Sequence, residues 1–198
     1  MEDLDQAIDE FWNWFRNHRA EFDSLVNPDT PFWDVAVNEL KRINRLLWIE
    51  LSHPDGGTRD FIITVEGHCE AFPIVEAIIA RAPQIEGWNF IALKPPMGFD
   101  FTTNYEGITF HPSAMWFRIL GNSYQPQGLA LQIGLPNLTT ANRRQAQNAM
   151  LIILDTALGE RAAATLLHAI DVVPLPNNPS ASGYTQLPKL PALIARNL

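Results

Sequence analysis

The chain has 198 residues, of which 46% are hydrophobic and 18% charged, and its formal net charge at pH 7 is −8. This length fits one domain, and the apolar fraction is enough to stabilise a core without disulfides or a metal. The negative charge and the scattered Lys and Arg residues argue against a nucleic-acid partner, because a phosphate backbone would be repelled. The same charge keeps a cytosolic protein in solution, so it does not identify a partner.

The sequence also indicates a compartment. Its first residues are acidic where a targeting peptide would be basic, and no apolar run approaches the roughly 20 residues that span a bilayer. Cys69 is the only cysteine, so no intramolecular disulfide forms and no oxidising compartment is needed. We expect a cytoplasmic protein with no membrane contact and no cofactor.

The N-terminal part is predicted to be helical. Residues 3–25 carry apolar side chains at helical spacing, which predicts one long amphipathic helix. After a short break, Thr30 supplies an N-cap and Pro31 a first helical residue for a second helix that runs to about residue 44. We therefore expect the two helices of residues 1–44 to pack as a helical hairpin or together to cover a sheet.

The strongest strand signal is a β-hairpin of residues 45–52 and 59–66. The segment between them contains Asp55-Gly56, a pair that suits a type I′ turn. A turn centred on this pair sets Trp48 opposite Ile63. Because both faces of the hairpin are largely apolar, we expect it to lie inside the sheet with cover on each side.

The rest of the chain is predicted to alternate between helices and strands. A third helix is expected over residues 71–82 and a fourth over residues 141–158, closed by Gly159. Between them lies a predicted antiparallel meander of residues 88–93, 99–105, 108–110, 115–120 and 129–135. Glu106-Gly107 marks one of its bends.

The C-terminal part has weaker signals. The periodicity of residues 161–173 is too brief to choose between helix and strand, residues 174–183 are predicted to form a loop, and residues 190–198 a small tail helix. No internal repeat is visible. The expected fold is a single α+β domain over residues 1–198, with helices packed on a mostly antiparallel sheet of five to seven strands.

The densest polar cluster is Glu66-Gly67-His68-Cys69-Glu70, between a predicted strand and the third helix. A thiol near a helix N-terminus ionises more readily, and His68, His53 or His111 would be its base in a Cys-His hydrolase. Against this, side chains of adjacent residues rarely have useful mutual geometry, and no known nucleophile motif surrounds Cys69. The sequence favours an inert or capping cysteine.

Other catalytic and metal motifs are missing. The residues of metal-binding type are His53, Asp55, His68, Cys69, Glu70 and His111. Their spacing matches no known metal motif, so no metal site is predicted. There is no GxGxxG, Walker or GxSxG motif, so nucleotide-dependent and α/β-hydrolase chemistry lack their minimum parts.

Five residues are candidates for a binding surface. Trp14 flanks the apolar stripe of the first helix, where an aromatic groove would suit a partner, although such stripes more often form core. His53 and Asp55 belong to the predicted hairpin turn. Arg143 and Arg144 lie in the first turn of the fourth helix, against its dipole, and either an anion, an acidic loop or simple surface variation explains them.

A family resemblance covers about a third of the chain. Its residues are the hairpin followed by Glu66-Gly67, Phe72-Pro73-x-Val75, Ala82-Pro83 and Gly87-Trp88. With these, the stretch from Trp48 to Phe110 resembles a group of uncharacterised bacterial proteins that carry a domain of unknown function. The resemblance implies a bacterial origin and an α+β fold, and it transfers no functional residue.

We expect a non-enzymatic binding or accessory protein, such as an adaptor or an immunity protein, that acts on another protein through its surface. The acidic charge and the lack of a catalytic constellation are the reasons. The alternative is a small cysteine/histidine-dependent hydrolase centred on Cys69 and His68.

Overall fold

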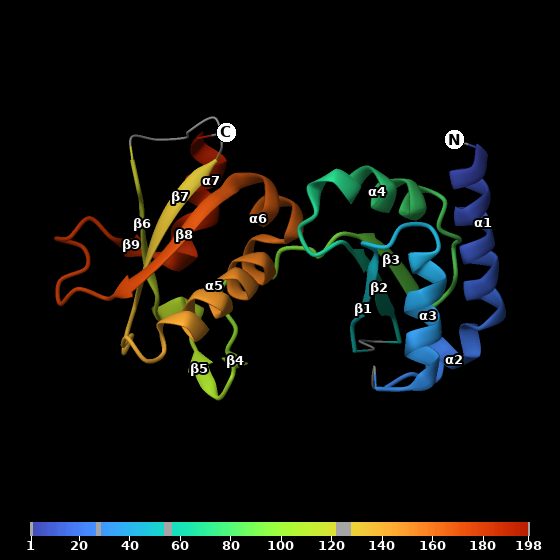
Figure 1. Cartoon of the computed structure of the whole chain (residues 1–198), viewed down its shortest axis with the longest axis horizontal. Helices are drawn as coiled ribbons and strands as arrows, with labels where there is room; N and C mark the ends of the chain where they lie inside the picture. Colours follow the sequence, from blue (N-terminus) through green and yellow to red (C-terminus); the bar gives the residue numbers. More distant parts are fainter. Residues whose placement is uncertain (1, 27–28, 54–56, 122–127, 198) are drawn as a thin grey trace. The chain divides into compact units, whose positions relative to one another are not determined.

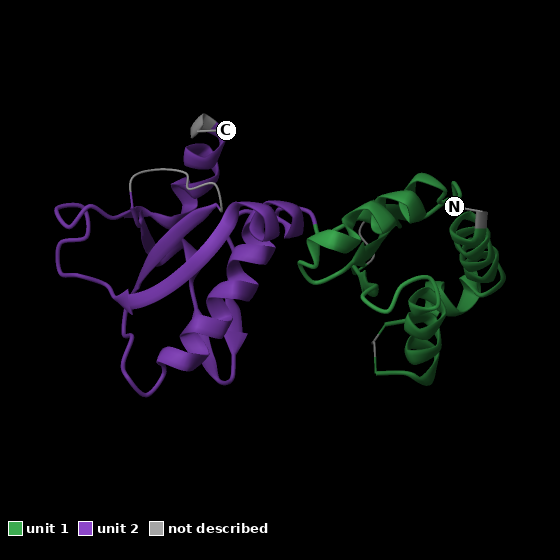
Figure 2. Ribbon diagram, turned by 45° about the horizontal axis from the view of Figure 1, so that its top comes forward, with its two compact units in different colours: residues 1–94 green, residues 95–198 purple. Residues whose placement is uncertain are grey.

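The structure is a computed structural model, and it describes residues 2–26, 29–53, 57–121 and 128–197. The chain divides into two compact units, residues 1–94 and 95–198, and each is considered by itself (Figure 2). The described residues form seven α-helices and three small sheets of three, two and four strands.

The fold class is α+β, as predicted, but the predicted sheet of five to seven mostly antiparallel strands is wrong. The single domain over the whole chain stays a prediction, because one domain can contain two compact units.

The first unit places helices beside a three-stranded sheet (Figure 1). Its elements are α1 (Glu2–Asn17), α2 (Arg19–Ser24), α3 (Pro31–Lys41), β1 (Trp48–Leu51), β2 (Arg59–Thr64), α4 (Phe72–Ala80) and β3 (Trp88–Ala92). The N-cap predicted at Thr30 is confirmed, because its side chain accepts a hydrogen bond from a backbone N–H in the first turn of α3.

The long helix predicted for residues 3–25 is wrong in one respect, because it breaks at His18. The backbone N–H of His18 is shared between the carbonyls of Trp14 and Phe15, each at 3.1 Å. Its imidazole Nδ1 also lies 2.9 Å from the Trp14 carbonyl. This side-chain contact competes with the regular helical hydrogen bonds, and the chain bends between α1 and α2.

An aromatic cluster holds α1 and α2 on the sheet. Its members are Phe11, Trp12, Phe15, Phe22, Phe61, Trp88 and Phe90. Phe61 on β2 lies within 5.2 Å of Phe15 and 5.7 Å of Phe22, measured between ring centroids. Trp12 also donates its indole N–H to the Ile78 carbonyl of α4, at 2.9 Å. Each fully buried side chain of this size stabilises the unit by about 1.5–3 kcal/mol.

The strands of the first unit pair in the order β1-β2-β3. β1 and β2 are antiparallel, but β3 is parallel to β2, and the connection between them runs through α4. The antiparallel meander predicted from residue 88 is therefore wrong. Its first strand is parallel to β2, and residues 103–105 and 108–110 pair in a sheet separate from that of residues 116–119 and 129–135. The predicted interior position of the hairpin is also wrong for β1, since β1 lies at the edge of the sheet.

The register of the hairpin differs by one residue from the prediction. Trp48 pairs with Thr64 and Ile49 pairs with Ile63, whereas the prediction set Trp48 opposite Ile63. The observed register places two fully buried isoleucines opposite each other, so burial of one face determines it. The Asp55-Gly56 pair, on which the predicted register was centred, lies outside the described residues.

The second unit has a four-stranded sheet and a separate hairpin (Figure 1). Its elements are β4 (Thr103–Tyr105), β5 (Ile108–Phe110), β6 (Trp116–Ile119), β7 (Leu129–Leu135), α5 (Arg143–Leu158), α6 (Glu160–Leu166), β8 (Leu167–Pro174), β9 (Thr185–Gln186) and α7 (Leu190–Asn197). Glu106 and Gly107 both have positive φ and form the two-residue turn of the β4–β5 hairpin, where a bend was predicted.

The larger sheet has the order β8-β7-β6-β9. β6 and β7 are antiparallel, whereas β8 is parallel to β7 and is reached through α5 and α6. Gly159, with φ of 79°, separates the two helices at the predicted end of α5. Leu190 and Ile194 of α7 are buried in the same core as α5, so the tail helix docks on its own unit.

Replacing Gly128 by Ala is expected to destabilise the protein by about 3 kcal/mol, because φ there is +110° and the new Cβ would lie 2.8 Å from the Leu166 carbonyl oxygen. Gly183→Ala is the matched control. It also has a positive φ, +78°, but no atom lies within 4 Å of the added Cβ, so its cost is about 1 kcal/mol. Urea unfolding measures both, and equal losses would contradict the backbone clash.

Candidate functional site

The outer edge of β1 faces away from the sheet, and no described strand pairs with it. Ser52 donates its backbone N–H to Asp60 at 3.1 Å, so these two residues form a hydrogen-bonded pair. Such pairs alternate along antiparallel strands, so Glu50 bonds to β2 while Ile49 and Leu51 point their N–H and C=O groups outward. Ile49 is fully buried but Leu51 is only half-buried, and Leu51 is therefore the open position of this edge.

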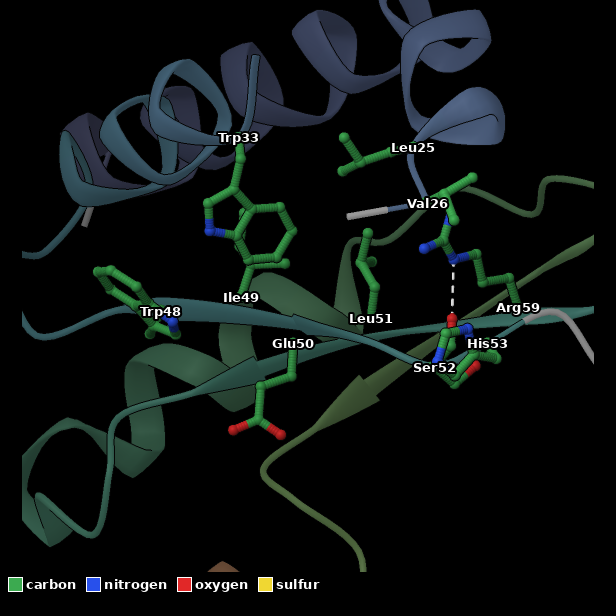
Figure 3. A pocket seen from close by; sticks show the side chains of 10 residues that line it. All are labelled: Leu25, Val26, Trp33, Trp48, Ile49, Glu50, Leu51, Ser52, His53 and Arg59. Atoms are coloured by element: carbon green, nitrogen blue, oxygen red, sulfur yellow. Dashed lines mark hydrogen bonds between the residues drawn. The ribbon is translucent and has the colours of Figure 1, made fainter. Parts of the chain in front are cut away.

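A groove of about 520 Å³ runs along this edge. It is lined by Leu25, Val26, Trp33, Trp48, Ile49, Glu50, Leu51, Ser52, His53 and Arg59, and is called the edge groove here. Figure 3 shows Trp33 and Leu25 on one side of it, with Ile49 and Leu51 projecting from β1 toward them and Glu50 turned to the opposite side. Helices α2 and α3 and strand β1 therefore build the two walls.

The edge groove exposes apolar side chains. Val26 is 81% exposed and Trp48 is 37% exposed, although both are large hydrophobic residues. The ammonium group of Lys41 lies 4.1 Å from the centroid of the Trp48 ring, and this cation–π contact fixes the indole at the start of β1. Exposed apolar side chains that line a groove are typical of binding surfaces.

Arg59 closes the far end of the edge groove. It is 8% exposed, and its guanidinium donates to the Ser52 carbonyl at 2.8 Å and to the Phe22 carbonyl at 3.0 Å. These bonds connect the end of β1 to α2 (Figure 3 shows the bond to Ser52). Burial lowers the pKa of Arg59, and the nearby Asp23 carboxylate opposes that shift, so the group stays charged.

The predicted Cys-His pair does not form a hydrogen-bonded unit. Cys69 begins a short 3-10 helix before α4, and its thiol contacts the Gly67 carbonyl at 3.6 Å. The His68 Nδ1 lies 3.3 Å from the Glu70 carboxylate instead. The backbone and His68 together lower the pKa of Glu70. His111, the other candidate base, lies in the second unit, 3.2 Å from the Thr102 hydroxyl.

The binding residues predicted from sequence lie in different places. His53 is exposed and lines the edge groove, whereas Asp55 lies outside the described residues. Trp14 stacks on His18, with ring centroids 4.4 Å apart, and lines a separate groove between α1 and α3. Arg143 pairs with Asp171 at 2.9 Å, and Arg144 is exposed.

Two other kinds of site are absent from the described part of the chain. It contains no group of three His, Cys, Asp or Glu residues that could hold a metal ion. None of its helices is both long enough and apolar enough to cross a membrane.

Sequence reasoning missed Trp33, Trp48 and Arg59. Arg59 had a usable signal, because it lies two and four residues before Phe61 and Ile63, which are buried on one face of β2. A charged residue on a buried face is rare and needs partners. Trp33 and Trp48 had no such signal, since their exposure depends on β1 being the edge strand.

No protein family model, curated protein or solved structure matches this chain. The resemblance of residues 48–110 to uncharacterised bacterial proteins therefore adds nothing to the site, which has to be interpreted from its own geometry.

Replacing Arg59 by Met is expected to destabilise the protein by about 2–3 kcal/mol, because the Ser52 and Phe22 carbonyls both lose their donor. Arg19→Gln is the matched control, since Arg19 also donates to a backbone carbonyl, that of Glu86, but on the surface. Its cost is expected to be below about 1 kcal/mol. Chemical denaturation compares the two, and a similar small loss in both variants would contradict the structural role of Arg59.

Cys69 is expected to react with a thiol-labelling reagent at a rate that does not depend on His68. The thiol is exposed, and the imidazole bonds to Glu70 and not to the sulfur. His68→Gln should therefore change the labelling rate of the folded protein at neutral pH by less than about twofold. A tenfold or larger fall in that variant would instead support the Cys-His hydrolase.

Proposed function

We propose that this chain is a non-enzymatic binding protein whose edge groove takes an extended segment of another protein. The segment adds as a short strand at Leu51 and lays apolar side chains against Trp33 and Trp48. The observation that carries the proposal is the open edge at Leu51 beside a groove with exposed apolar residues. Strand addition of this kind combines backbone hydrogen bonds, which give affinity, with side-chain pockets, which give specificity.

The second unit offers an internal comparison. Its strand β6 begins with Trp116-Phe117, as β1 begins with Trp48-Ile49, and each lies beside a central strand that also pairs with a parallel strand. In the second unit a short segment of the chain itself, β9, pairs antiparallel with β6. Among the described residues no segment does the same for β1. The comparison supports a partner segment as the missing strand.

The free energy expected for binding of the segment to the edge groove is that of a reversible contact. A strand paired at Leu51 forms two backbone hydrogen bonds, each worth about 0.5–1.5 kcal/mol net. One or two apolar side chains buried against the indoles add about 1.5–3 kcal/mol each. Part of this gain is offset by the entropy lost when a flexible segment becomes ordered. The net affinity is therefore expected to be weak, near the millimolar range, or about −4 kcal/mol.

The charge of the first unit favours a basic partner. Residues 1–94 hold 17 of the 22 Asp and Glu residues but only eight of the 14 Lys and Arg residues. A segment that carries Lys or Arg is therefore attracted, whereas the same face of a second copy is repelled. Nucleic acid is disfavoured for the same reason.

This proposal keeps the setting expected from the sequence. An adaptor or immunity protein in the bacterial cytoplasm needs no cofactor, and Cys69 stays a reduced thiol there. The hydrolase alternative rests on Cys69 and His68, which lie outside the edge groove.

Selection from a library of random ten-residue peptides displayed with free C-termini tests the proposal. We expect enrichment of sequences with alternating apolar residues and with Lys or Arg. Binding of an enriched peptide should slow amide hydrogen exchange at Leu51 and leave the amide of Glu50, which already bonds to β2, unchanged. Trp48→Ala should weaken binding about tenfold or more.

Leu151→Ala is the matched control, because Leu151 is also an exposed apolar residue, 54% exposed, but lies on α5 in the second unit. It should leave peptide binding unchanged. The proposal is wrong if no peptide is enriched over a selection against the Trp48→Ala variant. It is also wrong if sedimentation shows that the chain forms a dimer which Trp48→Ala dissociates, since a second copy would then occupy the edge.

A further inference from the structure

A second, smaller hollow of about 260 Å³ lies at the start of β1. It is lined by Lys41, Arg45, Leu46, Trp48, Glu66 and His68, and is called the cationic recess here. Trp48 also lines the edge groove, so one indole separates the two hollows. The edge groove runs from Trp48 to His53 along β1, and the cationic recess is therefore at the end of the groove where β1 begins.

The charges of the cationic recess are not balanced. Lys41 and Arg45 are basic residues, and no described carboxylate forms an ion pair with either of them. Glu66 is the one carboxylate of the lining, and His68 is held by Glu70 at 3.3 Å. Two cations against one anion leave the recess positive in a unit that is otherwise strongly acidic.

Local hydrogen bonds to backbone N–H groups fix the two turns that form the walls of the recess. Arg45 lies in the turn that connects α3 to β1, where Asn44 accepts a hydrogen bond from the backbone N–H of Leu46 at 2.9 Å. Glu66 lies in the turn after β2, where its N–H donates to the Thr64 hydroxyl at 3.1 Å and its φ is 50°. The backbone positions of Arg45 and Glu66 are therefore set before any ligand binds, which lowers the cost of binding.

We propose that the cationic recess binds the C-terminal carboxylate of the segment that occupies the edge groove. This inference rests on the proposed function and adds the orientation of the partner. A carboxylate at the start of β1 requires the segment to run antiparallel to β1, as β9 does along β6. The opposite orientation would bring an N-terminal ammonium group to Lys41 and Arg45, and like charges repel.

The length of the segment follows from the same geometry. A strand advances about 3.3 Å per residue, so three residues extend from the position opposite Leu51 to the start of β1. The carboxylate then belongs to about the fourth residue after the one that pairs with Leu51. The recognised element is therefore the last five or six residues of a partner chain, with apolar residues at alternate positions and basic residues elsewhere.

The test uses the most enriched peptide of the selection as a free acid and as a C-terminal amide, titrated into the full chain. The acid should bind at least about tenfold more tightly than the amide, the size of one charge-assisted hydrogen bond. Arg45→Gln should remove most of this difference, whereas Glu66→Gln should tighten binding of the acid by about threefold or more because it removes a repelling charge. Arg42→Gln is the control of equal charge change, since Arg42 lines the groove between α1 and α3, and it should have no effect.

The outcomes separate the two proposals. If the acid and the amide bind equally and both slow exchange at Leu51, the edge groove functions but the carboxylate assignment is wrong. If an amidated peptide that ends in Asp binds as tightly as the free acid, the recess binds an acidic side chain, and the assignment of the C-terminal carboxylate is again wrong. If no peptide is enriched at all, both proposals fail together.

Discussion

The parallel pairing of β3 with β2 is the constraint on which the first unit depends. Parallel strands cannot be joined by a tight turn, so the chain has to cross over through a helix, here α4. The crossover places β3 on the far side of β2 and makes β2 the central strand. The hairpin partner β1 is left at the edge, and the aromatic cluster around Phe61 fixes which face of β2 meets the helices. The edge groove is a consequence of this topology.

The same topology occurs in the second unit, with a different outcome at the edge. There β8 pairs parallel to β7 through α5 and α6, and β6 takes the position that β1 has in the first unit. An unpaired edge is a liability for aggregation, and β9 covers the start of β6. In the first unit no described strand pairs with the outer side of β1, where Ile49 is buried below Trp33 and Leu51 is half-buried. Such an unpaired edge beside a groove is the feature on which the binding proposal rests.

The sequence predicts what depends on neighbouring residues and fails where distant strands meet. The N-cap at Thr30, the turn at Glu106-Gly107 and the end of α5 at Gly159 each follow from local backbone chemistry. The break at His18 depends on one side-chain hydrogen bond, which periodicity does not reveal. No local sequence pattern predicts that β3 pairs parallel to β2, because a buried strand has the same apolar pattern whichever strand lies beside it. The two units share their strand order without any visible repeat in sequence.

The sequence predicted only part of the candidate site, because the rest depends on which strands are neighbours. His53 was named, but as a turn residue, and Trp48 was predicted to be covered on both faces because its edge position could not be foreseen. Once β1 is known to be the edge strand, the position of the charged residues beside it can be interpreted, which composition alone does not allow. The net negative charge of the first unit attracts a basic segment but does not determine its orientation. Lys41 and Arg45, in contrast, form a small positive region at one end of the edge groove. Under the two proposals, the negative charge of the first unit favours a basic segment, and the cationic recess determines which end of that segment is bound.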